Sequence, residues 1–317
     1  MKIDLHSPYV FLPATQGTLR CLVEEILPGK ISPMLTRNKC DLVTLYGIDR
    51  LTIWADVPLQ VNHLPATLSR EPSVTSRRMR MNPQWKSKIE LSQPTHCDLA
   101  KIHDALAGYV QFYPNYVELN IDLLTNSYFR ACSFKNQLLS AARFLHVQNR
   151  VSAHETTLYV GKRSALVHTG IVKKDPHVIA VYCDRPSKDE RAKKYPSLTS
   201  CMHLEHRLYG APAFASHGIN SLEDLLSFDH ASFHNRMQRM QILPSQTELG
   251  ALLASITNEP HSSADAALRK RARTWQKRHM VDETFCLHNA LRCTPQLIEK
   301  LSEQSFTDWL ESGLDIH

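Results

Sequence analysis

The segment Cys201–Tyr209 (CMHLEHRLY) carries the residues best suited to chemistry. In a strand its side chains alternate, so His203, Glu205 and Arg207 share one face. The carboxylate of Glu205 can bind a divalent cation, and the guanidinium of Arg207 can hold a phosphate. The same alternation is also typical of a solvated sheet face, so this segment alone leaves both interpretations open.

A second segment repeats the pattern. Tyr116–Leu124 (YVELNIDLL) alternates apolar residues with Glu118, Asn120 and Asp122. If the two strand faces converge, Asp122 and Glu205 can share one hard cation, since such ions prefer oxygen ligands. We therefore predict a site for Mg²⁺ or Mn²⁺ that is formed by these two carboxylates.

Tyr182 closes the apolar segment Val178–Cys183. Packing is the commoner role of a tyrosine at a strand end, and nucleophilic attack is the alternative. The reference pKa of a tyrosine is about 10, so a nearby cation or metal must favour the phenolate. Lys188, Arg185 and Arg207 are the candidate cations.

Two basic segments are candidates for contact with nucleic acid. Residues 65–94 form a polar, basic stretch around Trp85, which we expect to be a long loop or a hairpin with Ile89–Leu91. Residues 269–278 contain no acid and have the apolar spacing of an amphipathic helix. The predicted DNA-binding residues are Arg77, Arg78, Arg80, Trp85, Lys86, Arg269, Lys270, Arg271, Arg273, Lys277 and Arg278.

The pattern around these residues predicts an α+β fold, an antiparallel sheet flanked by helices, with a helical C-terminal region. The expected divisions are an irregular segment 1–46, a domain 47–210 that carries the candidate site, and the helical region 211–317. Besides the strands above, the predicted elements are strands at Ile48–Asp56, Thr157–Val160 and Ala165–Thr169, and helices at Asp98–Gly108, Ser133–Val147, Leu222–Phe228, Thr247–Ile256 and Gln296–Glu303.

Composition excludes several classes of protein. The chain has 317 residues, 43% of them hydrophobic and 21% charged, with a net charge of +6, so neither disorder nor a fibrous repeat is expected. No stretch approaches the ~18 apolar residues of a membrane helix, and no secretory signal or phosphate-binding glycine loop is found. The eight cysteines are dispersed and lack the spacing of a standard zinc site. We expect a protein of the reducing cytoplasm without membrane contact.

Taken in order, four pieces of the chain resemble the replication initiation proteins of filamentous phages and rolling-circle plasmids, the gene II and replication-initiation-factor group. Ile48–Ile53 (IDRLTI) resembles the family's opening I-D-x-L strand, and Val117–Leu123 (VELNIDL) its R-I-D strand. Leu158–Ser164 (LYVGKRS), followed by Val178–Tyr182 (VIAVY), resembles the block Y-x-G-x-x-x-S … I-Y-D-K. Met202–Leu208 (MHLEHRL) resembles the V-R-x-E-x-R strand.

The resemblance implies an origin-specific DNA nicking and strand-joining enzyme that starts rolling-circle replication of a phage or plasmid. By position, Tyr182 would attack the phosphodiester and become linked to the 5′ phosphate. Asp122 and Glu205 would hold Mg²⁺ or Mn²⁺, and Arg207 would stabilise the charge that develops on the phosphate.

The sequence departs from the family pattern at two positions. Asp184 stands where the family has a lysine two residues after the tyrosine, and Lys188 is the nearest replacement. His203 stands where the family has an arginine. The alternative nucleophiles are Tyr159, Tyr195 and Tyr209.

The implied partners are double-stranded origin DNA, single-stranded DNA, and the helicase and polymerase of a bacterial host, in whose cytoplasm the protein would act. A single nucleophilic tyrosine per chain favours a homodimer for strand transfer. Two other interpretations stay open, a non-catalytic DNA-binding regulator on the same scaffold and a transposase-like strand transferase with the same phosphotyrosine chemistry.

Overall fold

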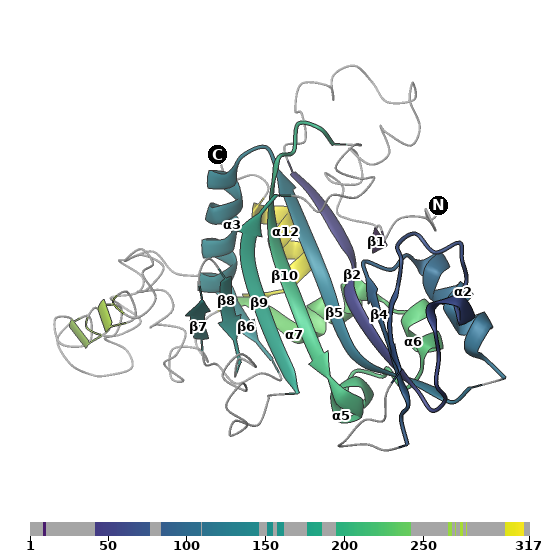
Figure 1. The fold of residues 1–317 in the computed structure, drawn as a ribbon. Coiled ribbons are helices and arrows are strands. Elements are labelled where there is room, and N and C mark those ends of the chain that lie inside the picture. Colours follow the sequence, from purple (N-terminus) through teal and green to yellow (C-terminus); the bar gives the residue numbers. More distant parts are fainter. Residues whose placement is uncertain are drawn as a thin grey trace.

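The computed structural model describes residues 9–10, 42–76, 84–108, 110–145, 151–154, 157–161, 176–185, 195–241 and 302–313, and a few helical positions between 266 and 277. These residues form an α+β fold, as the sequence predicts, with a large antiparallel sheet and helices packed on it (Figure 1). No helix in this part of the chain is both long enough and apolar enough to span a bilayer.

The large sheet has nine strands within the described residues. Eight of them run in the order β3-β4-β2-β5-β10-β9-β8-β7, and β1 pairs with β2. The bounds are β1 Tyr9–Val10, β2 Leu42–Ala55, β3 Ser73–Ser76, β4 Ser87–Ser92, β5 Phe112–Thr125, β7 Val151–His154, β8 Thr157–Val160, β9 His177–Asp184 and β10 Ser200–Tyr209. The long strands β2, β5 and β10 form its centre, so the two segments predicted to carry the site are neighbours.

The helices have 5 to 14 residues, and several of them begin at clear capping residues. Thr95 caps α2 and Ser221 caps α6, each in a reciprocal capping box with the acid three residues later. The bounds are α2 His96–Leu106, α3 Tyr128–Ala141, α5 Gly210–Ala215, α6 Leu222–Leu226, α7 His230–Met237 and α12 Phe306–Gly313, with a short 3₁₀ turn η2 at Val61–His63. A small second sheet joins β6 Ala142–Phe144, β11 Gln238–Gln241 and β12 Glu303–Gln304.

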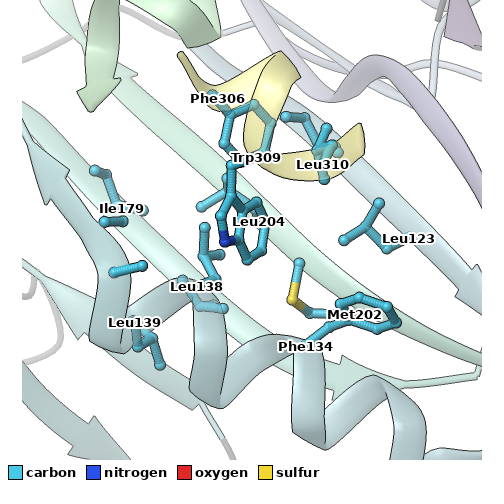
Figure 2. Close-up of a cluster of buried hydrophobic side chains, with 14 of the residues drawn as sticks. Leu123, Phe134, Leu138, Leu139, Ile179, Met202, Leu204, Phe306, Trp309 and Leu310 are labelled. Carbon is cyan, nitrogen blue, oxygen red and sulfur yellow. The ribbon is translucent and has the colours of Figure 1, made fainter. Parts of the chain in front are cut away.

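One face of the large sheet is apolar and carries the helices. Its β5 and β10 residues, among them Ile121 and Leu204, pack in two buried clusters. The first cluster joins β5, β9 and β10 to α3 and α12, and Figure 2 shows Phe306 and Trp309 of α12 beside Leu204. The second cluster joins the other ends of β2 and β5 to α2, α5, α6 and α7. Because side chains alternate along each strand, the opposite face carries the polar residues of β5 and β10, together with a third, smaller apolar cluster that includes Leu45, Leu124 and Cys201.

Several sequence predictions of local structure need correction. The helix expected at Ser133–Val147 is α3, which runs earlier and ends at Ala141 because the chain then enters β6. Residues Glu303–Gln304 form β12, where the sequence predicted the end of a helix. Of the two alternatives for residues 65–94, the hairpin is confirmed, since β3 pairs with β4. The strand expected at Ala165–Thr169 and the helix expected at Thr247–Ile256 lie outside the described residues.

The C-terminal helix α12 is an integral part of the first apolar cluster. Phe306 is fully buried there. We expect Phe306→Ala to lower the free energy of unfolding by about 3–5 kcal/mol, because it removes a large buried ring and leaves a cavity. Urea unfolding measures this change. The control is Phe129→Ala, whose ring is 84% exposed and whose removal should change stability by no more than about 0.5 kcal/mol. Equal effects of the two substitutions would contradict the packing of α12.

A group of buried histidines lies on the helical face of the sheet. His177 Nε2 and His206 Nδ1 are 2.9 Å apart, and His206 also packs edge-on against His234 of α7. Both nitrogens of His234 are buried without a hydrogen-bond partner. Burial lowers the pKa of His206 and of His234 well below the usual value, and it lowers the pKa of His230 to about 4. These imidazoles are therefore neutral in the folded protein near neutral pH.

Because these histidines are buried and neutral, we predict that the free energy of unfolding falls at acidic pH. The unfolded chain takes up protons at these histidines near pH 6.5, whereas in the folded chain His230 does so only near pH 4 and burial holds the pKa of His206 and of His234 well below the usual value. Stability contributed by the neutral rings is therefore fully present above about pH 6.5 and is lost as the pH falls toward 4. Urea midpoints measured between pH 7.5 and pH 4.5 test this. His234→Phe should flatten the profile, while substitution of the exposed His63 by Gln should leave it unchanged.

Candidate active site

The polar face of the sheet gathers the residues that the sequence singled out. In the strand register His203 of β10 lies opposite Asp122 of β5 on one side and Tyr182 of β9 on the other. Glu205 lies opposite Asn120 and Arg207 opposite Glu118. Residues that face each other across an antiparallel pair point to the same side of the sheet. The predicted nucleophile, carboxylates and guanidinium therefore share one wall.

Glu205 is the centre of this wall. Its Oε1 accepts a hydrogen bond of 2.5 Å from the hydroxyl of Tyr182. Its Oε2 accepts two hydrogen bonds from Arg207, 2.9 Å from Nε and 2.6 Å from Nη2. The carboxylate thus connects a phenol to a guanidinium, and its side chain is 2% exposed. Low exposure strengthens both interactions, since the local dielectric constant is lower than that of water.

A β-bulge in β2 adds a third carboxylate beside Glu205. Ile48 pairs with Leu119 and Arg50 with Glu118, so Asp49 is the extra residue between them. Bulges commonly redirect a side chain, and here one carboxylate oxygen each of Asp49, Glu118 and Glu205 lies within 4.8 Å of the others. Gln93 Nε2 donates to Asp49 Oδ1 at 2.9 Å and supports this arrangement. We call these three residues the acidic group.

Burial and neighbouring charges both act on the acidic group and on Tyr182 beside it. Arg207 Nε is 3.4 Å from Glu118 Oε1, in addition to its contacts with Glu205. Burial and the negative charge of Glu205 still raise the pKa of Glu118 to about 7. Burial and Glu205 also raise the pKa of the Tyr182 phenol above its usual value, so the phenol keeps its proton. An added cation would favour the charged form of both groups.

A second group lies farther along the same face. His203 Nδ1 is 2.9 Å from Asp122 Oδ1 and 3.7 Å from the sulfur of Cys201. Asn120 Nδ2 donates to the same Asp122 oxygen at 2.9 Å. Burial opposes a charge on His203, but Asp122 and Cys201 outweigh it and raise the pKa of His203 well above the usual value. We call Asp122, Cys201 and His203 the mixed group.

The ring of Tyr182 connects the two groups. It stacks on the imidazole of His203 with 4.6 Å between centroids and an angle of 20°. Its hydroxyl points to Glu205 of the acidic group. The stacked imidazole and the hydrogen bond together fix the orientation of the phenol.

The two groups differ in their access to solvent. Asp122, Cys201 and His203 are all buried. Asp49 and Tyr182 are half-buried, the side chain of Arg207 is 24% exposed, and Arg50 is exposed. The solvent-facing side of the site is therefore formed by Asp49, Tyr182, Arg207 and Arg50, whereas Glu118 and Glu205 are buried like the mixed group.

The structure brings together most of the predicted site residues. It differs from the sequence prediction in the neighbours of the two predicted metal ligands, Asp122 and Glu205. Tyr182, Glu205 and Arg207 are in direct contact. Asp122 lies on the same face, but its closest ligand-type neighbours are His203 and Cys201, whereas those of Glu205 are Glu118 and Asp49. A cation shared by Asp122 and Glu205 stays a prediction. Lys188, predicted to assist the tyrosine, lies outside the described residues.

The alternative nucleophiles occupy other surroundings. The ring of Tyr159 lies 5.8 Å from the Arg207 guanidinium carbon. Tyr209 packs on Tyr116 at the far end of β10, with 4.7 Å between ring centroids. Tyr195 belongs to a small apolar cluster with residues of β2 and β5. Tyr182 donates its hydroxyl to Glu205 of the acidic group, and Tyr116, which the sequence did not select, donates its hydroxyl to Glu118 of the same group.

The predicted DNA-binding residues are described only in part. Trp85 is half-buried against Trp54, with 6.3 Å between centroids, and Lys86 is exposed. Lys270, Arg273 and Lys277 are helical and exposed. Arg77, Arg78, Arg80, Arg269, Arg271 and Arg278 lie outside the described residues. DNA contact by these segments stays a prediction.

Comparison with known proteins gives a weak likeness of fold. No protein-family model matches the chain, and no curated protein matches it. Among solved structures it is similar to a rolling circle replication initiator protein from Geobacillus stearothermophilus. The two share 11% sequence identity with a TM-score of 0.35, over 64% of this chain and 89% of the other. The activity of this chain must therefore be inferred from its own residues.

Sequence reasoning missed two members of the site. Glu118 was recognised only as part of an alternating face, and Asp49 was not selected at all. Asp49 is nevertheless the acid of the IDRLTI segment, the piece that resembles the opening strand of the initiator family. That match could have identified it, whereas the bulge that turns it toward Glu205 depends on pairing between β2 and β5.

Proposed function

We propose that this protein is a metal-dependent DNA nicking and strand-joining enzyme that starts rolling-circle replication of a phage or plasmid, with Tyr182 as the nucleophile. One observation carries the proposal. A tyrosine hydroxyl donates to a buried carboxylate that is held by an arginine and adjoins two further carboxylates. Phosphotyrosyl transfer needs a phenol, a proton acceptor and positive charge at the phosphate, and this arrangement supports all three.

The residues fit a hard divalent cation. Three carboxylate oxygens within 4.8 Å of one another are ligands that Mg²⁺ and Mn²⁺ prefer. Burial, and after it the negative charge of Glu205, raises the pKa of Glu118, and a bound cation would favour its charged form. We place the cation on Asp49, Glu118 and Glu205, since Asp122 is hydrogen-bonded to His203. When bound, a cation there supplies positive charge that polarises a phosphate and favours a phenolate nearby.

The protein's own side chains then act as follows. Glu205 accepts the proton of the Tyr182 hydroxyl as the phenol oxygen bonds to phosphorus. The bond from phosphorus to the 3′ oxygen breaks, and that oxygen leaves as a hydroxyl after it takes up the proton that Glu205 accepted, which restores the Glu205 carboxylate. Arg207 exchanges a contact with Glu205 for the phosphate and balances its charge. The reverse reaction, with a 3′ hydroxyl as the attacking group, rejoins a strand and releases the tyrosine.

A covalent-adduct assay tests the proposed function. The purified protein is incubated with a library of single-stranded oligonucleotides that have randomised centres and a label at the 3′ end, with Mn²⁺ or with EDTA. We expect labelled DNA to comigrate with denatured protein only when Mn²⁺ is present, and sequencing of the adducts would reveal the origin sequence. If the protein binds single-stranded or supercoiled DNA but forms no covalent adduct with either, the result would instead support a non-catalytic regulator.

A further inference from the structure

The mixed group is not used by the proposed reaction, and its chemistry differs from that of the acidic group. Asp122, Cys201 and His203 offer an oxygen, a sulfur and a nitrogen ligand, and these atoms all lie within 4.8 Å of one another. We propose that the mixed group binds Zn²⁺, or a related thiophilic divalent ion, as a second metal site that is distinct from the acidic group. This inference is independent of the proposed function.

The separations of the ligand atoms fit a tetrahedral ion. Zinc bonds of about 2.3 Å to sulfur and about 2.0 Å to nitrogen and oxygen place neighbouring ligands about 3.3–3.6 Å apart. The observed separations are 2.9 Å between Asp122 Oδ1 and His203 Nδ1, and 3.7 Å between His203 Nδ1 and Cys201 Sγ. The third separation, between the Asp122 carboxylate and Cys201 Sγ, is at most 4.8 Å, so a modest rearrangement would complete three ligand positions.

The backbone sets this arrangement in advance. Cys201 and His203 are two residues apart on β10, so both side chains point to the same face. Asp122 is the direct partner of His203 on β5. Asn120 donates to Asp122 Oδ1 and the Tyr182 ring stacks on the His203 imidazole, so two neighbours restrain the ligands. Such supporting contacts are typical of metal sites, because they orient the ligands.

Charge balance favours an ion at this buried position. An isolated charge there would be costly, as all three residues are buried. Binding of one dication would displace two protons, one from the Cys201 thiol and one from between His203 and Asp122. The net charge of the group then stays the same, because the two released protons balance the dication.

Cobalt titration of the full-length protein tests the proposal. Addition of Co²⁺ to protein stripped of metal is expected to produce a near-ultraviolet thiolate-to-cobalt band that saturates at one equivalent. Cys201→Ser should abolish the band and His203→Gln should weaken cobalt binding at least tenfold. Cys183→Ser is the matched control, since Cys183 is also buried but points to the helical face, and it should keep the band. Absence of the band from the wild-type protein would overturn the proposal.

Zinc uptake provides a measurement that does not depend on the folding of a variant. Wild-type protein dialysed against Zn²⁺ is expected to retain one zinc, with a single sulfur neighbour at about 2.3 Å in X-ray absorption. A shell of oxygen and nitrogen without sulfur would refute the site. So would a band that persists in Cys201→Ser or that disappears equally in Cys183→Ser.

Discussion

Replacement of Tyr182 by phenylalanine should abolish the covalent protein–DNA adduct, with a loss of about 10³-fold or more in its rate of formation. The substitution removes the attacking oxygen and keeps the ring that stacks on His203. Tyr182 is the phenol that donates to Glu205, whereas the phenol of Tyr116 donates to Glu118. Denaturing gels with DNA labelled at the 3′ end measure the adduct directly.

Tyr113→Phe is the matched control for this experiment. Tyr113 is a half-buried tyrosine of β5 whose ring contacts Phe214 of α5, on the helical face. The control protein should form the adduct at the wild-type rate. If Tyr182→Phe still forms the adduct, the nucleophile is another residue, and Tyr159, which lies near Arg207, becomes the first to test. Thermal unfolding of both variants verifies that the fold is intact.

Glu205→Gln is expected to have the second largest effect. The amide keeps the shape of the side chain but can neither accept the tyrosine proton nor contribute a charge to the acidic group. Loss of a positioned proton acceptor typically lowers rates by about 10²–10⁴-fold. The variant should also need more Mn²⁺ for half-maximal adduct formation, which separates this role from a purely structural one. Single-turnover rates at several Mn²⁺ concentrations measure both quantities.

Glu205→Gln should also lower the free energy of unfolding, although its main effect is on the rate of adduct formation. Arg207 loses two charge-assisted hydrogen bonds and keeps the longer contact with Glu118. A loss of about 1–3 kcal/mol in the free energy of unfolding follows, measurable with urea. The control is Glu90→Gln, which removes an acid of the same type from a partly exposed ion pair with Lys88. That pair contributes little to stability, so the control should unfold almost as the wild type does. Adduct formation by Glu205→Gln at the wild-type rate would contradict the assigned role.

The sequence alone was sufficient to identify the elements that carry the site. Alternation in Cys201–Tyr209 and Tyr116–Leu124 fixed which residues share a face, because side chains in a strand alternate whatever the strand pairs with. The caps at Ser221 and at the start of α2 are likewise local features of the chain. The fold class follows from these patterns, and the structure confirms it.

The tertiary structure decided how the acids are grouped. The register places Asn120 opposite Glu205 and His203 opposite Asp122, and this register depends on pairing between strands that are about 80 residues apart. The bulge that turns Asp49 toward Glu205 arises where β2 runs against β5. The position of α12 over the sheet is also a long-range result, since a short apolar helix can pack on any complementary surface. Spacing within one segment encodes the direction of a side chain, but partners from distant segments are chosen by the packing and hydrogen bonding of the whole chain.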